Sequence, residues 1–414
     1  MPEGLLGRKN HYIVGLDIGT TKTCALICEL AESKLTVRGM GIAESKGLRR
    51  GVVVNLDATV NSIKRAVEEA ERQAGLPVES VFVGLSGWHI KSFNREGAVA
   101  ITSSTREIGK EDIRRVIETA KAISLPTDRE IVHVLPQEFV VDGQDGIGDP
   151  LGLLGTRLEV KVHIITSAVT AAQNIVTAVN RSGILVADTI LQQLASSEST
   201  LSSDDKEMGV ALLDIGGGTI DLAIYAQGAI QHSAVLPLGG DHITNDIAVG
   251  LRTTIPEAEK IKKSYGCAKS VLIQADVPFE VPNLSGRAPK VTGKKILCEL
   301  VQPRAEEMLS LVKEDIRQAG FEKLLGAGIV ITGGTVLLEG FIDLAEDVFE
   351  LPVRLGIPQG LQDMGEVLES PVFSTVVGLA HYGYRTHYLV SARNRSRSRL
   401  ARSVNWLKTQ WGRA

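Results

Sequence analysis

Two turns in the sequence carry residue types suited to binding a phosphate group together with a metal ion. Asp214 ends an apolar run and is followed by Gly216, Gly217, Gly218 and Thr219, and 197 positions earlier Asp17 is followed by Gly19, Thr20, Thr21 and Lys22. Glycine lets the backbone approach an anion and point N–H groups at it. An aspartate just before such a turn is well placed to hold Mg²⁺ through water. For either turn alone, a plain hairpin remains the alternative.

A third glycine turn follows a buried run over residues 328–332 and consists of Gly333, Gly334 and Thr335, after which we expect a helix. Such a turn lets the backbone lie close to a flat nucleoside. Four further residues are candidates for the phosphate, ribose or base side: Gly239, Gly240, Glu259 and Lys262. For Lys262, a solvated helix position is the alternative. The three turns in this order predict an ATP- and Mg²⁺-binding cleft between two similar half-domains.

The composition excludes several classes of protein. The chain has 414 residues, of which 43% are hydrophobic, as is typical of soluble α/β proteins. Four scattered cysteines without a CxxC pair (Cys24, Cys28, Cys267, Cys298) fit reduced thiols in a cytosol better than a disulfide framework. No run approaches 18 apolar residues and residues 1–10 lack an apolar signal-peptide core, so we expect neither a membrane span nor secretion.

The C-terminal residues differ in charge from the rest of the chain. From residue 393 onward there are six Arg, one Lys and no acid, so this tail carries +7 and the remainder −11 of the net −4. We expect residues 391–399 to be a disordered linker. Residues 400–414 read as an amphipathic helix at an anionic membrane surface, with an apolar stripe, an edge tryptophan and flanking cations: Leu400, Val404, Leu407 and Trp411, Trp406, Arg402 and Lys408. Docking on the protein itself and RNA binding are the alternatives; we expect no nucleic-acid partner.

The periodicity of apolar residues predicts two α/β halves, each interrupted by an insert. We assign residues 1–91, 167–200 and 369–390 to the first half, and 201–237 with 310–368 to the second. The inserts are residues 92–166 and 238–309. Three local expectations are a helix over residues 57–73 capped by Asp57, a loop over 142–156 and a polar linker over 201–207.

The three turns resemble those of the actin/Hsp70/sugar-kinase ATPase superfamily. Longer matches resemble the bacterial cell-division FtsA family: residues 51–59, Ser86-Gly87-Trp88-His89-Ile90, residues 150–159 and residues 378–383. The resemblance implies an actin-like ATPase fold, with two duplicated ribonuclease-H-like halves, an inserted subdomain in each, and a C-terminal amphipathic helix.

The resemblance also implies a function in cell division. It implies a peripheral, polymerising scaffold that anchors the FtsZ ring to the cytoplasmic face of the inner membrane at the division site. Later division proteins would be recruited through the first insert, and the FtsZ C-terminal peptide would bind the second insert at Arg304 and Glu307. From the residues alone, both are only exposed helix charges.

The resemblance further places Gln192 where actin-like relatives carry the group that activates water. An amide can orient a water molecule but cannot take its proton. We therefore expect at most slow ATPase activity, with ATP mainly stabilising a closed, polymer-competent state. Two other functions are compatible with the same superfamily, namely a sugar or small-molecule kinase and a pilus-assembly adaptor.

Overall fold

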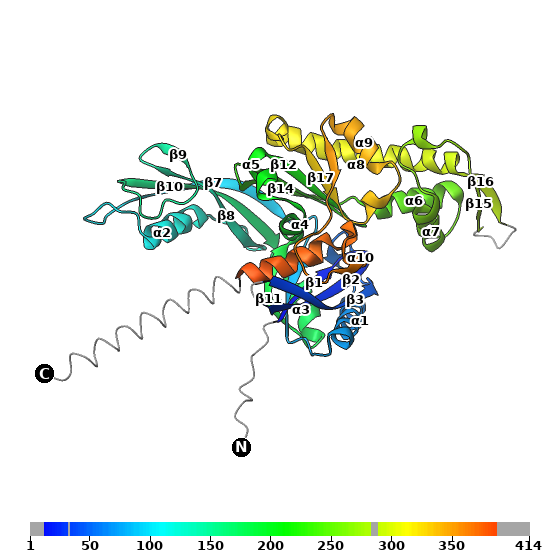
Figure 1. The fold of residues 1–414 in the computed structure, drawn as a ribbon, viewed down its shortest axis with the longest axis horizontal. Helices are drawn as coiled ribbons and strands as arrows, with labels where there is room; N and C mark the ends of the chain where they lie inside the picture. Colours follow the sequence, from blue (N-terminus) through cyan, green and yellow to red (C-terminus); the bar gives the residue numbers. More distant parts are fainter. Residues whose placement is uncertain (1–11, 32–33, 283–288, 387–414) are drawn as a thin grey trace, which may run out of the picture.

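The computed structural model describes residues 12–31, 34–282 and 289–386. Two five-stranded sheets form its centre (Figure 1). The first has the order β11-β6-β1-β2-β3, with bounds Leu185–Leu191, Ser80–Leu85, Tyr12–Ile18, Lys22–Ala31 and Lys34–Glu44. The second has the order β14-β13-β12-β17-β18, with bounds Ala229–Leu236, Ile220–Ala226, Val210–Ile215, Ile329–Thr332 and Val353–Leu355.

The two sheets share one topology. In each, three consecutive strands form an antiparallel meander, and the first of these strands pairs in parallel with a later one, which in turn pairs with a fifth. The turns at Asp17 and Asp214 therefore occupy equivalent places, at the first hairpin of each sheet. The duplication predicted from the two turns is therefore present in the strand order.

Helices cover both faces of the first sheet, which explains the uninterrupted apolar character of its strands. In β2, Ala25 and Ile27 face the core formed with α1 (Leu56–Ala74) and α3 (Val169–Arg181). Alternate residues such as Leu26 face the opposite core, which includes Val376 and neighbours from a helix over residues 374–386. Asn55, rather than the expected Asp57, caps α1, because its side chain accepts from the N–H of Ala58 at 3.0 Å.

The first insert is a four-stranded sheet with the order β7-β10-β8-β9, covered by α2 (Lys110–Lys121). The strands span Lys91–Ala100, Arg157–Ala168, Arg129–Val141 and Gln144–Ile147. The expected loop over 142–156 was wrong in part, because β9 lies within it and pairs with β8. The insert also contacts β14 of the second half, where the hydroxyl of Ser92 donates to the carbonyl of Ser233 at 2.6 Å.

The second insert lies at the opposite end of the molecule from the first (Figure 1). It contains α6 (Gly240–Leu251), α7 (Ile255–Tyr265), a 3₁₀ turn (Ser270–Leu272), and the hairpin of β15 (Pro278–Val281) with β16 (Lys290–Gly293). Helix α8 (Lys294–Ala319) begins there and continues through Pro303 to the second sheet, where it packs with α9 (Phe341–Phe349).

Several short elements complete the described chain. Helix α4 (Gln192–Thr200) lies between the sheets and α5 (Ser203–Met208) follows it directly. The expected polar linker over 201–207 was wrong, because Ser202 and Asp205 form a capping box that starts α5. The remaining elements are β4 (Leu48–Arg49), β5 (Val52–Val53), α10 (Gly365–Leu368), and 3₁₀ turns at Glu322–Leu324, Thr335–Leu337 and Pro371–Phe373.

No helix within the described residues is long and apolar enough to cross a membrane. The predicted linker over 391–399 and the predicted membrane-binding residues between Leu400 and Trp411 lie outside the described residues.

Candidate nucleotide-binding site

A cleft of about 540 Å³ lies between the two halves. The residues predicted from the three turns line it together, with members from both sheets: Asp17, Gly19, Thr20, Thr21, Lys22, Asp214, Gly216, Gly217, Gly218, Thr219, Gly333, Gly334 and Thr335. Gln192, Gly240, Glu259 and Lys262 line it too. Gly239 does not; it lies behind the second turn, where a Cβ would meet the carbonyl oxygen of Gly217 at 2.5 Å.

The two hairpin turns face each other closely across this cleft. Each turn is closed by a backbone hydrogen bond: the N–H of Gly19 donates to the carbonyl of Lys22 at 2.9 Å, and the N–H of Gly216 donates to the carbonyl of Thr219 at 3.0 Å. A Cβ at Gly217 would lie 2.0 Å from Oγ1 of Thr21, a separation that no side chain can adopt. The glycine therefore provides the space that the hydroxyl of the other half occupies.

The aspartates of the two turns differ in their partners. Asp17 accepts from Nζ of Lys22 at 3.0 Å and from Nε2 of Gln192 at 3.1 Å. Asp214 accepts from Oγ1 of Thr375 at 2.9 Å, and burial raises the pKa of Asp214 to about 6. Burial alone would lower the pKa of Lys22, but Asp17 and neighbouring acids raise it above its ordinary value. Lys22 thus remains cationic in the cleft.

Asp221 on β13 also lines the cleft, and no sequence motif predicted it. It is the cross-strand partner of Asp214 and accepts from Oγ of Ser86 at 2.6 Å and from Oγ1 of Thr219 at 2.9 Å. Because Ser86 belongs to the first half, this contact joins the two halves. Burial raises the pKa of Asp221 to about 7. The available signal was an acid within an otherwise apolar, fully buried strand.

These donors fit a magnesium ion with a phosphate group. The buried carboxyl groups of Asp214 and Asp221 both resist ionisation, and a nearby divalent cation would favour their charged forms. Hard carboxylate oxygens are the ligands Mg²⁺ prefers. Asp17 and Asp214 would hold the ion, and the glycine N–H groups and Lys22 would face the phosphate.

The third turn closes the other end of the cleft. Gly333 has φ 93°, and a Cβ there would lie 2.5 Å from the carbonyl oxygen of Ile215, so glycine is required. Oγ1 of Thr335 donates to the carbonyl of Gly216 at 2.9 Å and thereby ties this turn to the phosphate turn. The helix expected directly after Gly334 is only the 3₁₀ turn Thr335–Leu337.

Lys262 is not a solvated helix residue. Its Nζ lies 2.7 Å from Glu259, donates to Oγ1 of Thr244 at 2.8 Å and to the carbonyl of Gly240 at 3.0 Å. Its side chain is only 12% exposed. The Glu259–Lys262 pair therefore forms a fixed polar wall of the cleft beside Gly240.

Arg304 and Glu307 lie near the middle of α8, far from the cleft lining. Nε of Arg304 contacts Asp246 on α6 at 2.6 Å, and its guanidinium also pairs with Glu307. The hydrogen bond to Asp246 raises the pKa of Arg304. Arg304 therefore lies on a surface formed jointly by α6 and α8 and carries a partly compensated charge.

The duplicated sheets and the cleft between them define a protein of the actin-like ATPase fold. Solved structures with this likeness include the PilM–PilN type IV pilus biogenesis complex, with a TM-score of 0.66 at 17% identity over 90% of this chain and 98% of that chain. MreB5 of Spiroplasma citri bound to ADP gives 0.53 at 13% identity over 91% and 97%. At these identities the likeness shows the fold alone.

Sequence comparisons give the family. A model described as "Cell division protein FtsA" matches residues 211–378, and one described as "SHS2 domain inserted in FTSA" matches residues 87–166. The chain is 49% identical over 377 residues to the cell division protein FtsA of Pseudomonas aeruginosa, covering 91% of this chain and 90% of that protein. It is 40% identical over 405 residues to that of Escherichia coli K12, covering 96% of each. The chain belongs to the FtsA family of cell division proteins.

Proposed function

We propose that the protein is an ATP-binding, polymerising scaffold that tethers the FtsZ ring to the cytoplasmic face of the inner membrane at the division site. The observation that carries the proposal is the single cleft in which two duplicated turns bring Asp17, Lys22 and Asp214 together with the Gly333 turn. Actin-like structures such as the MreB5 structure above hold a nucleotide, and this cleft has the charge and backbone geometry for one.

The same cleft favours binding over rapid hydrolysis. Gln192 is held by Asp17, and its amide can orient water without taking a proton. The expected result is tight Mg²⁺-dependent ATP binding with turnover well below about 1 per second, the lower end of typical enzymatic rates. Equilibrium binding of a fluorescent ATP analogue, with and without Mg²⁺, measures the first; steady-state phosphate release measures the second. Rapid turnover would contradict the scaffold proposal.

Membrane tethering is assigned to residues 400–414. Each basic residue near an anionic surface contributes on the order of 1 kcal/mol, so one copy binds weakly and a polymer binds through avidity. In vesicle co-sedimentation with ATP, the full chain should sediment and a chain ending at residue 399 should not. Replacing Trp406 and Trp411 by alanine should abolish sedimentation, whereas Trp88→Ala, which removes a tryptophan that is 62% exposed on the body, should leave it intact.

The second insert is assigned to the FtsZ C-terminal peptide, through the surface around Arg304 and Glu307. Arg304→Glu should weaken peptide binding at least tenfold, because it reverses a charge that both Asp246 and Glu307 hold in place. Arg317→Glu is the matched control, since Arg317 lies on the same helix and pairs with Glu314 in the same i,i+3 manner. Equal effects of the two substitutions on peptide binding would contradict the assignment of the peptide to the surface around Arg304 and Glu307.

The first insert is assigned two other roles: the recruitment of later division membrane proteins and contacts within a filament.

A further inference from the structure

Helix α4 connects an aspartate of the cleft to the end of the described chain. At its first residue, Nε2 of Gln192 donates to Asp17 of the first half at 3.1 Å. One turn later, the hydroxyl of Ser196 donates to the carbonyl of Gln192 at 3.1 Å, within the helix itself. The helix is otherwise almost entirely buried. A rearrangement of Asp17 therefore acts directly on this short, buried helix.

The helix over residues 374–386 packs along α4 with unusual closeness. A Cβ at Gly378 would lie 1.7 Å from the carbonyl oxygen of Ala195, so the two backbones are in direct contact. Oγ of Ser199 donates to the carbonyl of Ser374 at 2.7 Å, and Thr375 donates to Asp214 at 2.9 Å. The first turns of this helix are thus fixed both to α4 and to the cleft.

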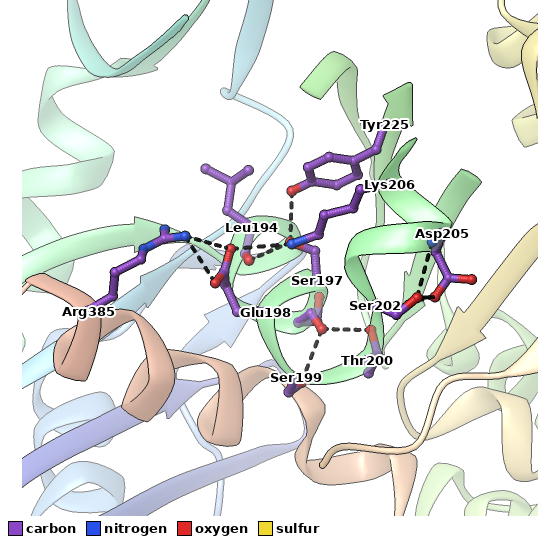
Figure 2. A network of polar contacts seen from close by, with 11 residues as sticks. Leu194, Ser197, Glu198, Ser199, Thr200, Ser202, Asp205, Lys206, Tyr225 and Arg385 are labelled. Atoms are coloured by element: carbon purple, nitrogen blue, oxygen red, sulfur yellow. Dashed lines mark hydrogen bonds and ion pairs between the residues drawn. The ribbon is translucent and has the colours of Figure 1, made fainter. Parts of the chain in front are cut away.

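Its last turn is fixed in a different way, through an ion-pair network with α4 and α5 (Figure 2). Nη1 of Arg385 lies 3.1 Å from both carboxylate oxygens of Glu198 on α4, and Nζ of Lys206 on α5 reaches the same carboxylate at 3.5 Å. Arg385 is 54% exposed, whereas the side chains of Glu198 and Lys206 are only 21% and 18% exposed, so Arg385 is the solvated end of this network. The contact between Glu198 and Arg385 is therefore the releasable part of an otherwise buried interface.

We propose that α4 and the helix over 374–386 form a lever that couples the cleft to the C-terminal tail, with the Glu198–Arg385 contact as its release point. Mg²⁺ and phosphate would compete for the oxygens of Asp17 and Asp214 that now accept from Gln192 and Thr375. Freed from these contacts, α4 would shift, Glu198 would leave Arg385, and the last turn before residue 387 would open. Release would give the tail greater reach toward a membrane. The inference rests on the proposed function.

Linkage makes the lever testable in both directions, because a ligand that favours one state must change the affinity of the other ligand by the same factor. ATP should raise the affinity of the full chain for phosphatidylglycerol-containing vesicles about fivefold or more, within the usual range of such couplings. The vesicles should raise the affinity for ATP by the same factor. Glu198→Gln and Arg385→Gln should each bind vesicles without ATP as tightly as the wild type does with ATP, and should show a coupling factor near one.

Polymerisation would also link ATP to vesicle binding through avidity, so a second measurement is needed that excludes polymers. It uses a chain ending at residue 399, without vesicles, at a protein concentration too low for polymers to form. Amide hydrogen exchange at residues 381–386 should be faster with Mg²⁺·ATP than without it, and equally fast in both conditions in Arg385→Gln. Glu314→Gln, which cuts the Glu314–Arg317 pair on α8, should behave as wild type.

The outcomes separate the two proposals. If the wild-type chain binds neither ATP nor vesicles, the proposed function fails and the lever with it. If it binds both ligands with unchanged affinities and unchanged exchange, the lever alone is wrong. Wild-type coupling in both variants would also overturn it, since the coupling would then not pass through Glu198 and Arg385.

Discussion

Replacing Gly378 by alanine should force the helix over 374–386 away from α4. The new Cβ would lie 1.7 Å from the oxygen and 2.3 Å from the carbon of the Ala195 carbonyl. Real Cβ atoms essentially never lie within 3.0 Å of a heavy atom outside their own residue and its chain neighbours. The two backbones must therefore separate by at least 1.3 Å, the difference between 3.0 Å and 1.7 Å. Because a backbone carbonyl inside a buried helix cannot rotate aside, the strain cannot be relieved locally.

The expected change in the free energy of unfolding of Gly378→Ala is the sum of two opposing contributions. Overpacking a buried contact costs about 1–3 kcal/mol, and more where backbone must move. A Gly→Ala change inside a helix returns about 1 kcal/mol of helix propensity. We expect a net loss of about 2 kcal/mol in the free energy of unfolding. The affinity for ATP should fall as well, since Thr375 would be pulled from Asp214.

Gly383→Ala is the matched control, on the same helix. The three atoms nearest to its Cβ would all belong to side chains, those of Ile13 and Phe82 at 2.7 Å, and side-chain atoms can shift further than the carbonyl of a buried helix. Its free energy of unfolding should stay within about 1 kcal/mol of wild type, because the propensity gain offsets a smaller strain. Urea unfolding followed by circular dichroism measures both variants, with the m-value as the check on comparability. Equal midpoints for the two variants would refute this account of the interface.

Three further predictions concern the cleft and the base of the first insert. Asp221→Asn should flatten the decline in stability as pH rises from 4 to 7. The folded pKa of about 7 gives the wild type a stabilising proton that is lost over that window, which lowers its free energy of unfolding by about 1.4 kcal/mol per pH unit. Denaturant unfolding at pH 5 and 8 measures the difference between wild type and variant. Burial lowers the pKa of His163 to about 3, so wild type should lose about 2 kcal/mol between pH 6.5 and 5, and His163→Gln should lose less in the same titration. Gly217→Ala should weaken ATP at least tenfold in equilibrium binding, with Thr21→Ala restoring part of the loss, because the new Cβ meets the Thr21 hydroxyl.

The parts of the site that the sequence predicts are those with a local cause. The turns at Asp17 and Asp214 are hairpins, whose glycines, hydroxyls and flanking apolar strands lie within about fifteen consecutive residues. Their relation to each other followed from their likeness, and the equivalent strand orders bear out the duplication. The same local character explains why the helix expected over residues 57–73 is present as α1, Leu56–Ala74.

The missed residues are those whose role depends on distant neighbours. Ser86 enters the cleft because β6 ends beside β13 of the other half, 135 positions later in the chain. Thr375 reaches Asp214 across 161 positions, and nothing in its own segment indicates a ligand. Helix α5 is a different case. Its capping box of Ser202 and Asp205 is local in the sequence, but the polar composition of the segment is also typical of a linker.

The two halves are alike in topology, yet the cleft they form is asymmetric. The first turn presents hydroxyls and Lys22, while the second presents bare glycine backbone, and each fills the space the other leaves: Thr21 against Gly217 and Thr20 against Gly218. Helix α4 then adds a neutral amide, that of Gln192, to Asp17, and the helix over 374–386 adds a neutral hydroxyl, that of Thr375, to Asp214. Neither group can serve as a proton acceptor of the strength that hydrolysis requires, but both can hold or release a helix. On the proposed function, we therefore expect these two contacts to respond to a bound nucleotide rather than to take part in its hydrolysis.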